Sequence, residues 1–315
     1  MKLQYKNSIL AFTTFLLLAL ASCKEEKETK TTEQEIKPER DYVEVITNGM
    51  DFEMVDEVKS GWTTFKYINK SFEPHFFILE KMPDTLGLYT YKKDLFPPFT
   101  SAFKHFEKGE IDAGMKEFEK IPEWFYKVEL AGGVGLTSKK TTSISTIFLE
   151  PGTYVMECYV RMPDGLGHVF MGMVKELKVS NESKGNKPPK ADFNMNISSE
   201  KGITFVDSIK AGNHILSAKF EDQKQYEHFM GHDVNLVKIE HDSLIPSLNN
   251  WLNTIDFMAF RTPEPEGLLF LGGVEDLPTG STGYFEVDLE KGNYVLISEI
   301  PNAVERKMIK RFSVY

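Results

Sequence analysis

The chain has 315 residues, of which 41% are hydrophobic and 12% aromatic, and a formal net charge of −10. This apolar content is sufficient for packed cores, and the length suggests about two domains. The acidic balance excludes nucleic acid as a partner, because binding to phosphates needs a basic face.

The N-terminal residues have the order of a secretory signal. Lys2 and Lys6 precede an apolar run, Ile9–Ala21, which is too short to span a membrane comfortably. The run leads through Leu-Ala-Ser to Cys23, a pattern that resembles a bacterial lipobox. This resemblance implies that residues 1–22 are removed and that lipid is attached to Cys23. The alternative is an ordinary signal peptide followed by an unrelated cysteine.

The predicted lipid sets the expected location. Lys24, Glu25 and Glu26 follow Cys23 and resemble the lysine-plus-acidic export signal of Bacteroidetes surface lipoproteins. We therefore expect an outer-membrane lipoprotein that faces the periplasm or the cell surface. The membrane, reached through the lipid anchor, is its first expected partner, and the leaflet that carries the anchor stays open.

Two polar segments divide the rest of the chain. Residues 23–41 are charged and lack apolar periodicity, which predicts a disordered tether. The segment 181–191 contains Lys-Pro-Pro-Lys among polar residues, which predicts a linker between domains. The expected domains are therefore residues 42–180 and residues 192–315.

The two expected domains resemble each other in sequence. Three pairs of segments match in the same order: Val55–Gly61 with Val206–Gly212, Pro74–Lys81 with Gly231–Lys238, and Leu149–Val155 with Leu289–Val295. Three matches in one order indicate a duplication. A repeat period this long indicates tandem domains and not a solenoid.

Aromatic and β-branched residues between turn formers predict strands in both halves. The expected strands of the N-terminal half are Gly61–Asn69, Phe76–Glu80, Thr142–Leu149, Thr153–Arg161 and His168–Val179. Between them, apolar residues recur at helical spacing over Phe99–Lys120, which Gly109 and Gly114 interrupt. A shorter helical segment, Pro246–Asn253, occupies the matching place in the C-terminal half. The sequence therefore predicts an all-β protein of two tandem Greek-key β-sandwich domains, each with a short helical insertion.

Cys158 is the only thiol that remains once Cys23 carries lipid, so no intramolecular disulfide is expected. Strand alternation places Cys158 on the same inward face as Tyr154 and Met156. The simplest interpretation is a buried thiol that packs as a small hydrophobic side chain. An unpaired thiol outside the cytoplasm is a liability unless it is buried or bound, which makes a metal site the second interpretation.

Four donor side chains occur in the order of a type 1 copper site. Such a site uses two neutral imidazoles and one thiolate in a plane, with a weak axial thioether. His75 would supply the first imidazole from an early strand. Cys158, His168 and Met173 follow within one strand–loop–strand unit and would supply the thiolate, the second imidazole and the thioether. The predicted cofactor is copper.

These segments resemble the cupredoxins, the plastocyanin and azurin superfamily. Pro74-His75 is similar to the Pro-His that places the first copper imidazole in plastocyanins. Pro151–Cys158 (PGTYVMEC) is similar to the Pro-Gly-x-Tyr-x-x-x-Cys strand that delivers the thiolate, and His168–Met173 (HVFMGM) to the ending that supplies the other two ligands. The likeness covers residues 42–179. It implies a cupredoxin-like fold with these ligands.

The segment after Cys158 departs from the plastocyanin and azurin pattern. Nine residues separate Cys158 from His168, which is longer than the loop of those proteins and closer to that of copper nitrite reductases. Met171 competes with Met173 as the axial ligand, because strand alternation would point both the same way. Gly172-Met173 matches the family ending, so Met173 is preferred.

The C-terminal half lacks the full donor set. His232 stands where His75 stands, but Ser298 replaces Cys158, no histidine follows it, and Met308 remains alone. A type 1 site cannot form without its thiolate, so this domain is expected to be copper-free. A catalytic second metal would need histidines gathered between the domains. The histidines available for that are His214, His228, His232 and His241.

Together these features predict a lipid-anchored, extracytoplasmic, cupredoxin-like protein that holds copper or transfers single electrons, with a redox protein as partner. A complete ligand set leaves no open position for a substrate, so we expect that the protein is not an enzyme. The alternative is a metal-free surface binding or structural module in which the same donors pack in the core. In that case the cupredoxin-like fold persists without its metal.

Overall fold

The computed structural model describes residues 41–315, which form one compact unit, Asp41–Tyr315. The predicted signal peptide, the lipidation site Cys23 and nearly all of the predicted tether lie outside the described residues. Within the described part, every helix is too short or too polar to cross a membrane.

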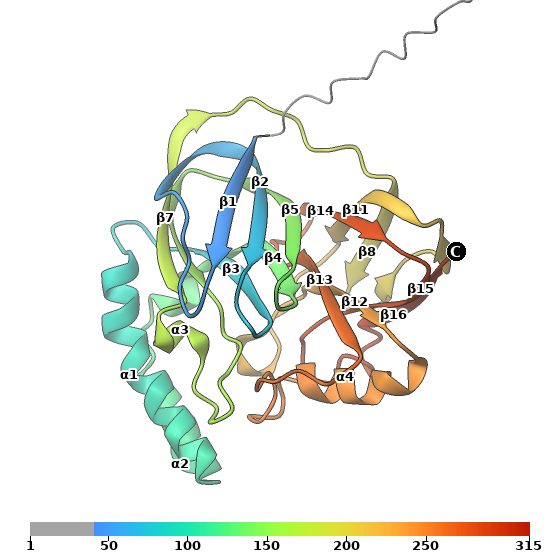
Figure 1. The fold of residues 1–315 in the computed structure, drawn as a ribbon. Coiled ribbons are helices and arrows are strands. Elements are labelled where there is room, and N and C mark those ends of the chain that lie inside the picture. The colour runs from blue at the N-terminus through green and yellow to red at the C-terminus, as the bar shows by residue number, and fades with distance from the viewer. Residues whose placement is uncertain (1–40) are drawn as a thin grey trace, which may run out of the picture. The chain divides into compact units, whose positions relative to one another are not determined.

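Two β-layers form the N-terminal half (Figure 1). One layer contains β1 (Tyr42–Thr47), β2 (Glu57–Asn69) and β5 (Thr142–Leu149). The other contains β3 (His75–Lys81), β4 (Glu129–Thr137), β6 (Gly152–Glu157) and β7 (Val174–Ser183). The connection from β3 to β4 contains α1 (Leu88–Glu107), α2 (Ile111–Glu117), η1 (Phe118–Lys120) and η2 (Phe125–Lys127), and α3 (His168–Met171) precedes β7.

The C-terminal half has the same two-layer plan. Its first layer contains β8 (Phe193–Ser198), β9 (Gly202–Thr204), β11 (Gly212–Phe220) and β14 (Thr282–Leu289). Its second contains β10 (Ser208–Ile209), β12 (Val234–Ile239), β13 (Leu268–Val274), β15 (Gly292–Ile297) and β16 (Ile309–Val314). The short helical elements η3 (Glu227–Phe229), η4 (Asp242–Leu244) and α4 (Ile245–Leu252) lie between β11 and β13.

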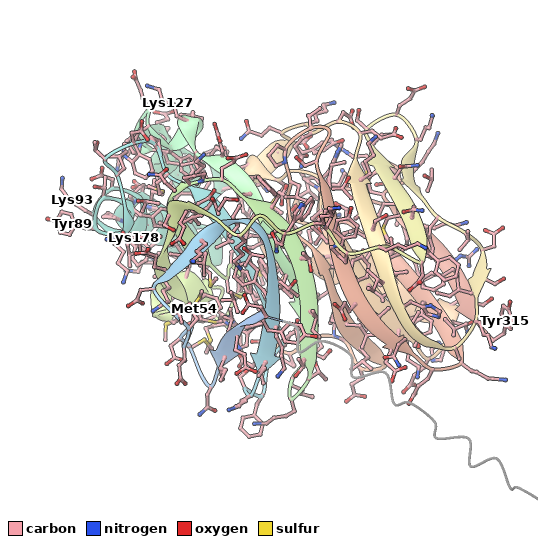
Figure 2. All side chains as sticks on the ribbon, turned by 90° about the horizontal axis from the view of Figure 1, so that it is seen from above. Met54, Tyr89, Lys93, Lys127, Lys178 and Tyr315 are labelled. Atoms are coloured by element: carbon pink, nitrogen blue, oxygen red, sulfur yellow. The ribbon has the colours of Figure 1, made fainter. Side chains whose placement is uncertain are left out.

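The layers of the two halves are continuous with each other. Thr146 of β5 pairs with Tyr284 of β14 in one layer, and Thr137 of β4 pairs with Leu271 of β13 in the other. Figure 2 shows the halves side by side, with Met54 and Lys178 in one and Tyr315 at the far end of the other. The hydrophobic core is continuous as well, because one cluster of buried side chains runs through both halves. The all-β prediction of two tandem sandwiches with helical insertions is confirmed.

Equivalent contacts recur in the two halves. Tyr154 donates a hydrogen bond to the carbonyl of Glu150 at 2.7 Å, and Tyr294 donates one to the carbonyl of Glu290 at 2.8 Å. An ion pair joins Lys175 to Asp56 in the first half and Lys310 to Asp207 in the second, and each aspartate is the second residue of the repeated segment. Residues at equivalent positions of the sequence repeat therefore form equivalent hydrogen bonds and ion pairs.

Several element bounds differ from the sequence prediction. Helix α1 begins at Leu88, well before the predicted start at Phe99, although it contains Pro97 and Pro98. Sequence periodicity missed this part because prolines normally end a helix. The buried face of α1 overrides that tendency, because its residues Tyr91 and Leu95 belong to a second hydrophobic cluster together with Val155 and Val169. In Figure 1, α1 and α2 lie on the side of the N-terminal half that also carries α3.

The strand predicted to run from Thr153 to Arg161 ends at Glu157, and the strand predicted from His168 begins only at Val174. The residues between them form a loop and the single helical turn α3. Strand β7 continues to Ser183 and β8 begins at Phe193, so residues 184–192 connect the halves, whereas the sequence prediction placed the linker at residues 181–191.

Candidate metal centre

Pairing between β3 and β6 brings His75 and Cys158 together. Ile78 pairs with Glu157 in antiparallel register, so Cys158 follows β6 at the end of the strand pair where β3 begins with His75. His168 reaches the same place from the first position of α3, where its backbone N–H donates to the Val160 carbonyl at 2.8 Å. Three donors that are far apart in the chain thus meet at one end of the first sandwich.

The three donor atoms form a compact triangle. The Nδ1 atoms of His75 and His168 lie 3.1 Å apart, and the Cys158 Sγ lies 3.9 Å from the first and 4.0 Å from the second. A planar metal with nitrogens at about 2.0 Å and sulfur at about 2.3 Å separates its donors by about 3.5–3.7 Å. The triangle therefore fits one metal ion after small shifts. All three side chains are fully buried.

Burial also sets the protonation of the donors. It lowers the pKa of His75 to about 3, with a further contribution from the neighbouring His168, and it lowers the pKa of His168 to about 4. Both imidazoles are therefore neutral at pH 7, as metal ligation requires. Burial raises the pKa of the Cys158 thiol to about 12, so a metal that binds the thiolate must displace its proton.

The outer nitrogens of the imidazoles have few partners. The His168 Nε2 lies 3.3 Å from an oxygen of Glu73, but the two atoms are not aligned as a hydrogen bond. The Nε2 of His75 is buried without a hydrogen-bond partner. With Nδ1 as the ligand atom, the proton of His168 stays on Nε2 and faces Glu73, an arrangement that resembles the carboxylate–histidine–metal triads of other proteins. Apart from its position next to Pro74-His75, no sequence pattern marks Glu73 as a partner of the site.

The structure distinguishes Met173 from Met171. Met173 is fully buried, its N–H donates to the His168 carbonyl, and its carbonyl accepts from the Cys158 N–H at 3.2 Å. Met171 is 47% exposed at the end of α3. Strand alternation does not apply here, because the segment turns through α3 and Gly172. Gly172 has a φ of +131°, and a Cβ there would lie 2.6 Å from the Met50 carbonyl oxygen.

The long loop between Cys158 and His168 is held by the C-terminal half. The Arg161 N–H donates to the carbonyl of Phe260, and the Thr262 N–H donates to the carbonyl of Arg161. The Arg261 guanidinium donates to the Pro163 carbonyl at 3.1 Å. Hydrogen bonds from the C-terminal half therefore hold the longer loop in position. Sequence reasoning missed these contacts because nothing local marks Arg261 as a partner of the loop.

The matching place in the C-terminal half has different chemistry. Asn235 pairs with Ile297 as Ile78 pairs with Glu157, so His232 and Ser298 are equivalent to His75 and Cys158. The His232 imidazole is bonded to the Tyr226 hydroxyl and to the Asp222 carbonyl. The histidines considered for a second metal have separate partners: His214 with Lys210, His228 with Thr254 and His241 with Ser243. None of them belongs to a metal-capable group among residues 41–315.

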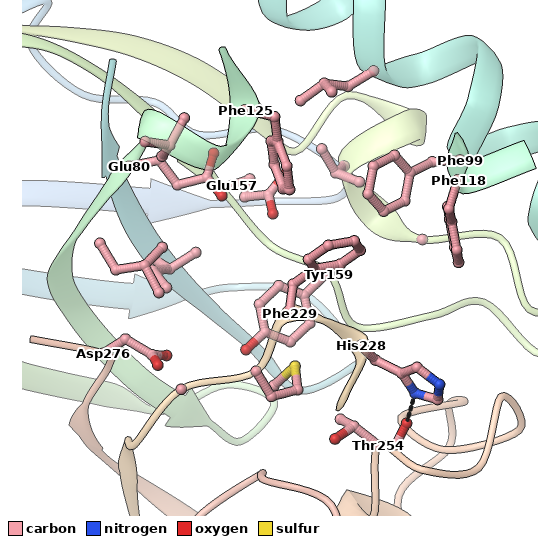
Figure 3. Close-up of a pocket in the computed structure, with 18 of the residues that line it drawn as sticks. Glu80, Phe99, Phe118, Phe125, Glu157, Tyr159, His228, Phe229, Thr254 and Asp276 are labelled. Carbon is pink, nitrogen blue, oxygen red and sulfur yellow. Dashed lines mark hydrogen bonds between the residues drawn. The ribbon is translucent and has the colours of Figure 1, made fainter. Parts of the chain in front are cut away.

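A cavity of about 470 Å³ lies between the helical insertion and the C-terminal half. Figure 3 shows Phe99 and Phe118 on one side of it and the carboxylates Glu80, Glu157 and Asp276 on the other. Glu80 and Asp276 each have a buried oxygen without a hydrogen-bond partner. The volume is typical of small-molecule pockets. No sequence pattern predicts this cavity, because its wall combines residues from both halves.

Comparison with known proteins was made on sequence and on structure. No protein-family model matches the chain. No curated protein sequence matches it. Solved structures do match, and they include blue copper proteins, multicopper oxidases and copper nitrite reductases.

Auracyanin A, a "blue" copper protein from Chloroflexus aurantiacus, is 16% identical over 44% of this chain and 98% of its own, with a TM-score of 0.27. The auracyanin of Roseiflexus castenholzii is 15% identical over 44% of this chain and 96% of its own, also at 0.27. The copper nitrite reductase of Nitrosomonas europaea is 10% identical over 87% of this chain and 93% of its own, at 0.23.

These matches include blue copper proteins, the class that the sequence motifs resemble. TM-scores this low carry no weight for the ligand assignment, which rests on the three donor atoms themselves. The matches also include oxidases and reductases, so they give no support to the expectation that the protein is not an enzyme.

Proposed function

We propose that the N-terminal half binds one copper ion and serves in one-electron transfer or in copper holding. His75 and His168 would each supply Nδ1, and Cys158 would supply its thiolate. The observation that carries this proposal is the triangle of two neutral imidazoles and one thiol, all buried and 3.1–4.0 Å apart. Copper bound there would supply a one-electron redox couple.

The donor set favours copper over other metals. A thiolate with two imidazoles and a nearby thioether suits copper, whereas structural zinc sites take four strong ligands. The Met173 thioether would be the weak axial donor, since its backbone is bonded to both Cys158 and His168. With these positions filled and the centre closed to solvent, a substrate has no free coordination position, which supports electron transfer and not catalysis.

The proposed location and partners follow from the N-terminal residues. Lipid on Cys23 would hold the protein on the outer membrane, outside the cytoplasm, in the periplasm or at the cell surface. A redox protein is the proposed partner of the copper centre. Near the centre, Phe72 is 80% exposed and lies in the loop that leads through Glu73 to His75. An exposed aromatic ring next to a buried ligand is a suitable contact for such a partner.

A second candidate function is a metal-free binding module. The cavity of about 470 Å³ supports it, because a pocket of this size with aromatic walls can enclose a small molecule. In that case the His75–His168 contact at 3.1 Å would be an ordinary N–H···N hydrogen bond within the core. The two candidate functions are distinguished by copper binding, which only the first one requires.

Titration of the purified protein with Cu²⁺ tests the proposal. Copper on the thiolate is expected to give an intense visible charge-transfer band that saturates at one equivalent and disappears on reduction. A protein that shows no such band, and whose Cys158 thiol still reacts with a thiol reagent after unfolding in the presence of Cu²⁺, would favour the metal-free module.

Replacement of Met173 by leucine is expected to keep copper bound but to raise its reduction potential. The three in-plane donors remain, whereas an axial thioether stabilises the oxidised ion more than the reduced one. The measurement is a redox titration of the visible band. Met171→Leu is the matched control and should leave the potential unchanged, because Met171 is half exposed at the end of α3. Equal shifts in both variants would contradict the assignment of Met173.

A further inference from the structure

The C-terminal half contains a second group of buried donors, all of them carboxylates. Asp233 precedes β12, Glu275 and Asp276 follow β13, and Glu299 follows β15, so the pairing of β12 with both neighbours gathers them. Their exposed fractions are between 0% and 2%. One oxygen each from Asp233, Glu275 and Glu299 lie within 4.8 Å of one another.

Two of these carboxylates are held in place by hydrogen bonds. Asp233 accepts from the Ser298 hydroxyl, from the Glu299 N–H and from the Asn235 amide. Glu299 accepts from the Tyr159 hydroxyl at 2.8 Å and from the same Asn235 amide at 3.0 Å. The oxygens are therefore fixed at defined positions before any ligand arrives.

Glu275 is different, because neither of its carboxylate oxygens has a hydrogen-bond partner although the side chain is fully buried. One of these oxygens is the one that lies near Asp233 and Glu299. An oxygen of Asp276 is unpartnered as well. Burial without a partner is costly for a carboxylate, so these atoms indicate a missing ligand that would contact them.

Within the part of the chain that the structure describes, these four carboxylates have no positively charged partner. Among residues 41–315, no lysine, arginine or histidine forms a hydrogen bond or ion pair with Asp233, Glu275, Asp276 or Glu299. Burial, followed by the mutual repulsion of these carboxylates, raises the pKa of Glu275 and of Glu299 well above the usual range. The group is therefore neutralised either by protons or by a bound cation.

We propose that Asp233, Glu275 and Glu299 bind a calcium ion. Carboxylate oxygens are ligands for hard cations, and calcium contacts them at about 2.3–2.6 Å, which allows two ligand oxygens up to about 5 Å apart. Magnesium keeps several waters and takes only one or two carboxylates, so a dry site with three carboxylates favours calcium. The site uses none of the copper donors and does not depend on the proposed function.

The cavity provides a route to the site. Tyr159 and Asp276 both line it, and Figure 3 shows Asp276 on the carboxylate side. Tyr159 donates to Glu299, which is a ligand of the site. Asp276, which follows Glu275 in the chain and has an unpartnered oxygen, therefore lies on the side of the cavity from which a cation would reach the site.

The bound ion would connect the two halves of the protein. Tyr159 belongs to the N-terminal half and bonds Glu299, and the Leu136 N–H of that half donates to Asn235, which bonds both Asp233 and Glu299. Neutralising the carboxylates removes their repulsion at this junction. Calcium is therefore expected to stabilise the protein as a whole.

The experiment uses protein treated with a chelator and then titrated with Ca²⁺. We expect binding of one equivalent by calorimetry and a rise in Tm of about 5 °C or more at calcium about 100-fold above Kd. Terbium in place of calcium is expected to luminesce on excitation of the protein, because the Tyr159 ring lies next to the site. The terbium measurement is made on the wild-type protein, so it does not depend on whether a variant folds.

Glu275→Gln is the decisive variant, because Glu275 makes no hydrogen bond that the change could break. It is expected to weaken calcium binding by more than about 100-fold and to abolish the calcium-dependent rise in Tm. Glu80→Gln is the matched control: another buried carboxylate with an unpartnered oxygen, but outside the site, so calcium binding should be unchanged.

Three results would overturn the proposal. Wild-type protein that binds no calcium at millimolar concentration would show that protons alone neutralise the carboxylates. Equal calcium binding by Glu275→Gln would place the ion elsewhere. Binding of Mg²⁺ or Mn²⁺ without binding of Ca²⁺ would contradict the choice of cation.

Discussion

Replacing Cys158 with alanine is expected to abolish the visible charge-transfer band and to weaken copper binding by more than about 100-fold, since loss of an outer-shell partner alone typically costs about 10–100-fold. Cys158 is the only thiol among residues 41–315 and completes the triangle with His75 and His168. Its loss leaves two imidazoles 3.1 Å apart and no thiolate. The measurement is a copper titration followed by absorption and by calorimetry.

The fold is expected to tolerate this change. Cys158 lies in the continuous core, where loss of a small buried side chain costs about 1–2 kcal/mol. The matched control is Ser298→Ala at the equivalent position of the C-terminal half, which should leave the copper band as it is in the wild type. A Cys158→Ala protein that binds copper as tightly as the wild type would contradict the proposed centre.

In the metal-free protein, buried neutral His168 is expected to contribute a loss of stability of about 3 kcal/mol as the pH falls from about 7 to about 4, and His168→Gln is expected to remove this contribution. The pKa of His168 is about 4 in the folded chain, against a usual value of 6.5. Below pH 6.5 the unfolded chain binds a proton that the folded chain excludes. Acid therefore favours unfolding until the pH approaches the folded-state pKa.

Comparison of wild type and variant isolates this contribution. Burial raises the pKa of Glu157 and of Asp233 to about 7, so their contribution has the opposite sign and is lost as the pH rises. Both groups are present in wild type and variant, so they cancel in the difference. Urea unfolding at pH 7 and pH 4 provides the free energies.

Glu73→Gln is the control for the pH measurement, because it keeps both imidazoles but removes the carboxylate 3.3 Å from the His168 Nε2. A negative charge there would favour the protonated imidazole, so this variant is expected to keep the full acid sensitivity of the wild type or to increase it. Parallel pH profiles for wild type and His168→Gln would show that His168 is not buried in its neutral form.

The donor residues could be found from sequence because their signals are local. Alternation along a strand predicts that Cys158 faces inward, and it is fully buried. The repeat was also visible, since the segments that lead into β6 and β15 match and carry the same tyrosine hydrogen bond. Strand alternation and short repeated segments depend only on residues that are close together in the chain, so they can be recognised from the sequence.

Another part of the repeat was missed because its cause is a contact across strands. Gly133 of β4 and Gly273 of β13 are equivalent, and a Cβ on either would lie 1.9 Å from a carbonyl oxygen of the neighbouring strand, that of Phe77 or of Val234. The sequence contains Gly-Gly-Val at both places. Without the strand pairing, nothing shows why a side chain is excluded there.

By itself, then, the sequence determined the all-β class, the duplication and the identities of the metal-binding candidates His75, Cys158, His168 and Met173. Only the tertiary structure decided that the first three meet within 4.0 Å and that Met173, not Met171, is buried beside them. It also decided that Arg261 holds the long loop and that Glu275 is buried without a partner. The physical reason is that distances and desolvation depend on which strands pair, and pairing joins residues that are remote in the chain.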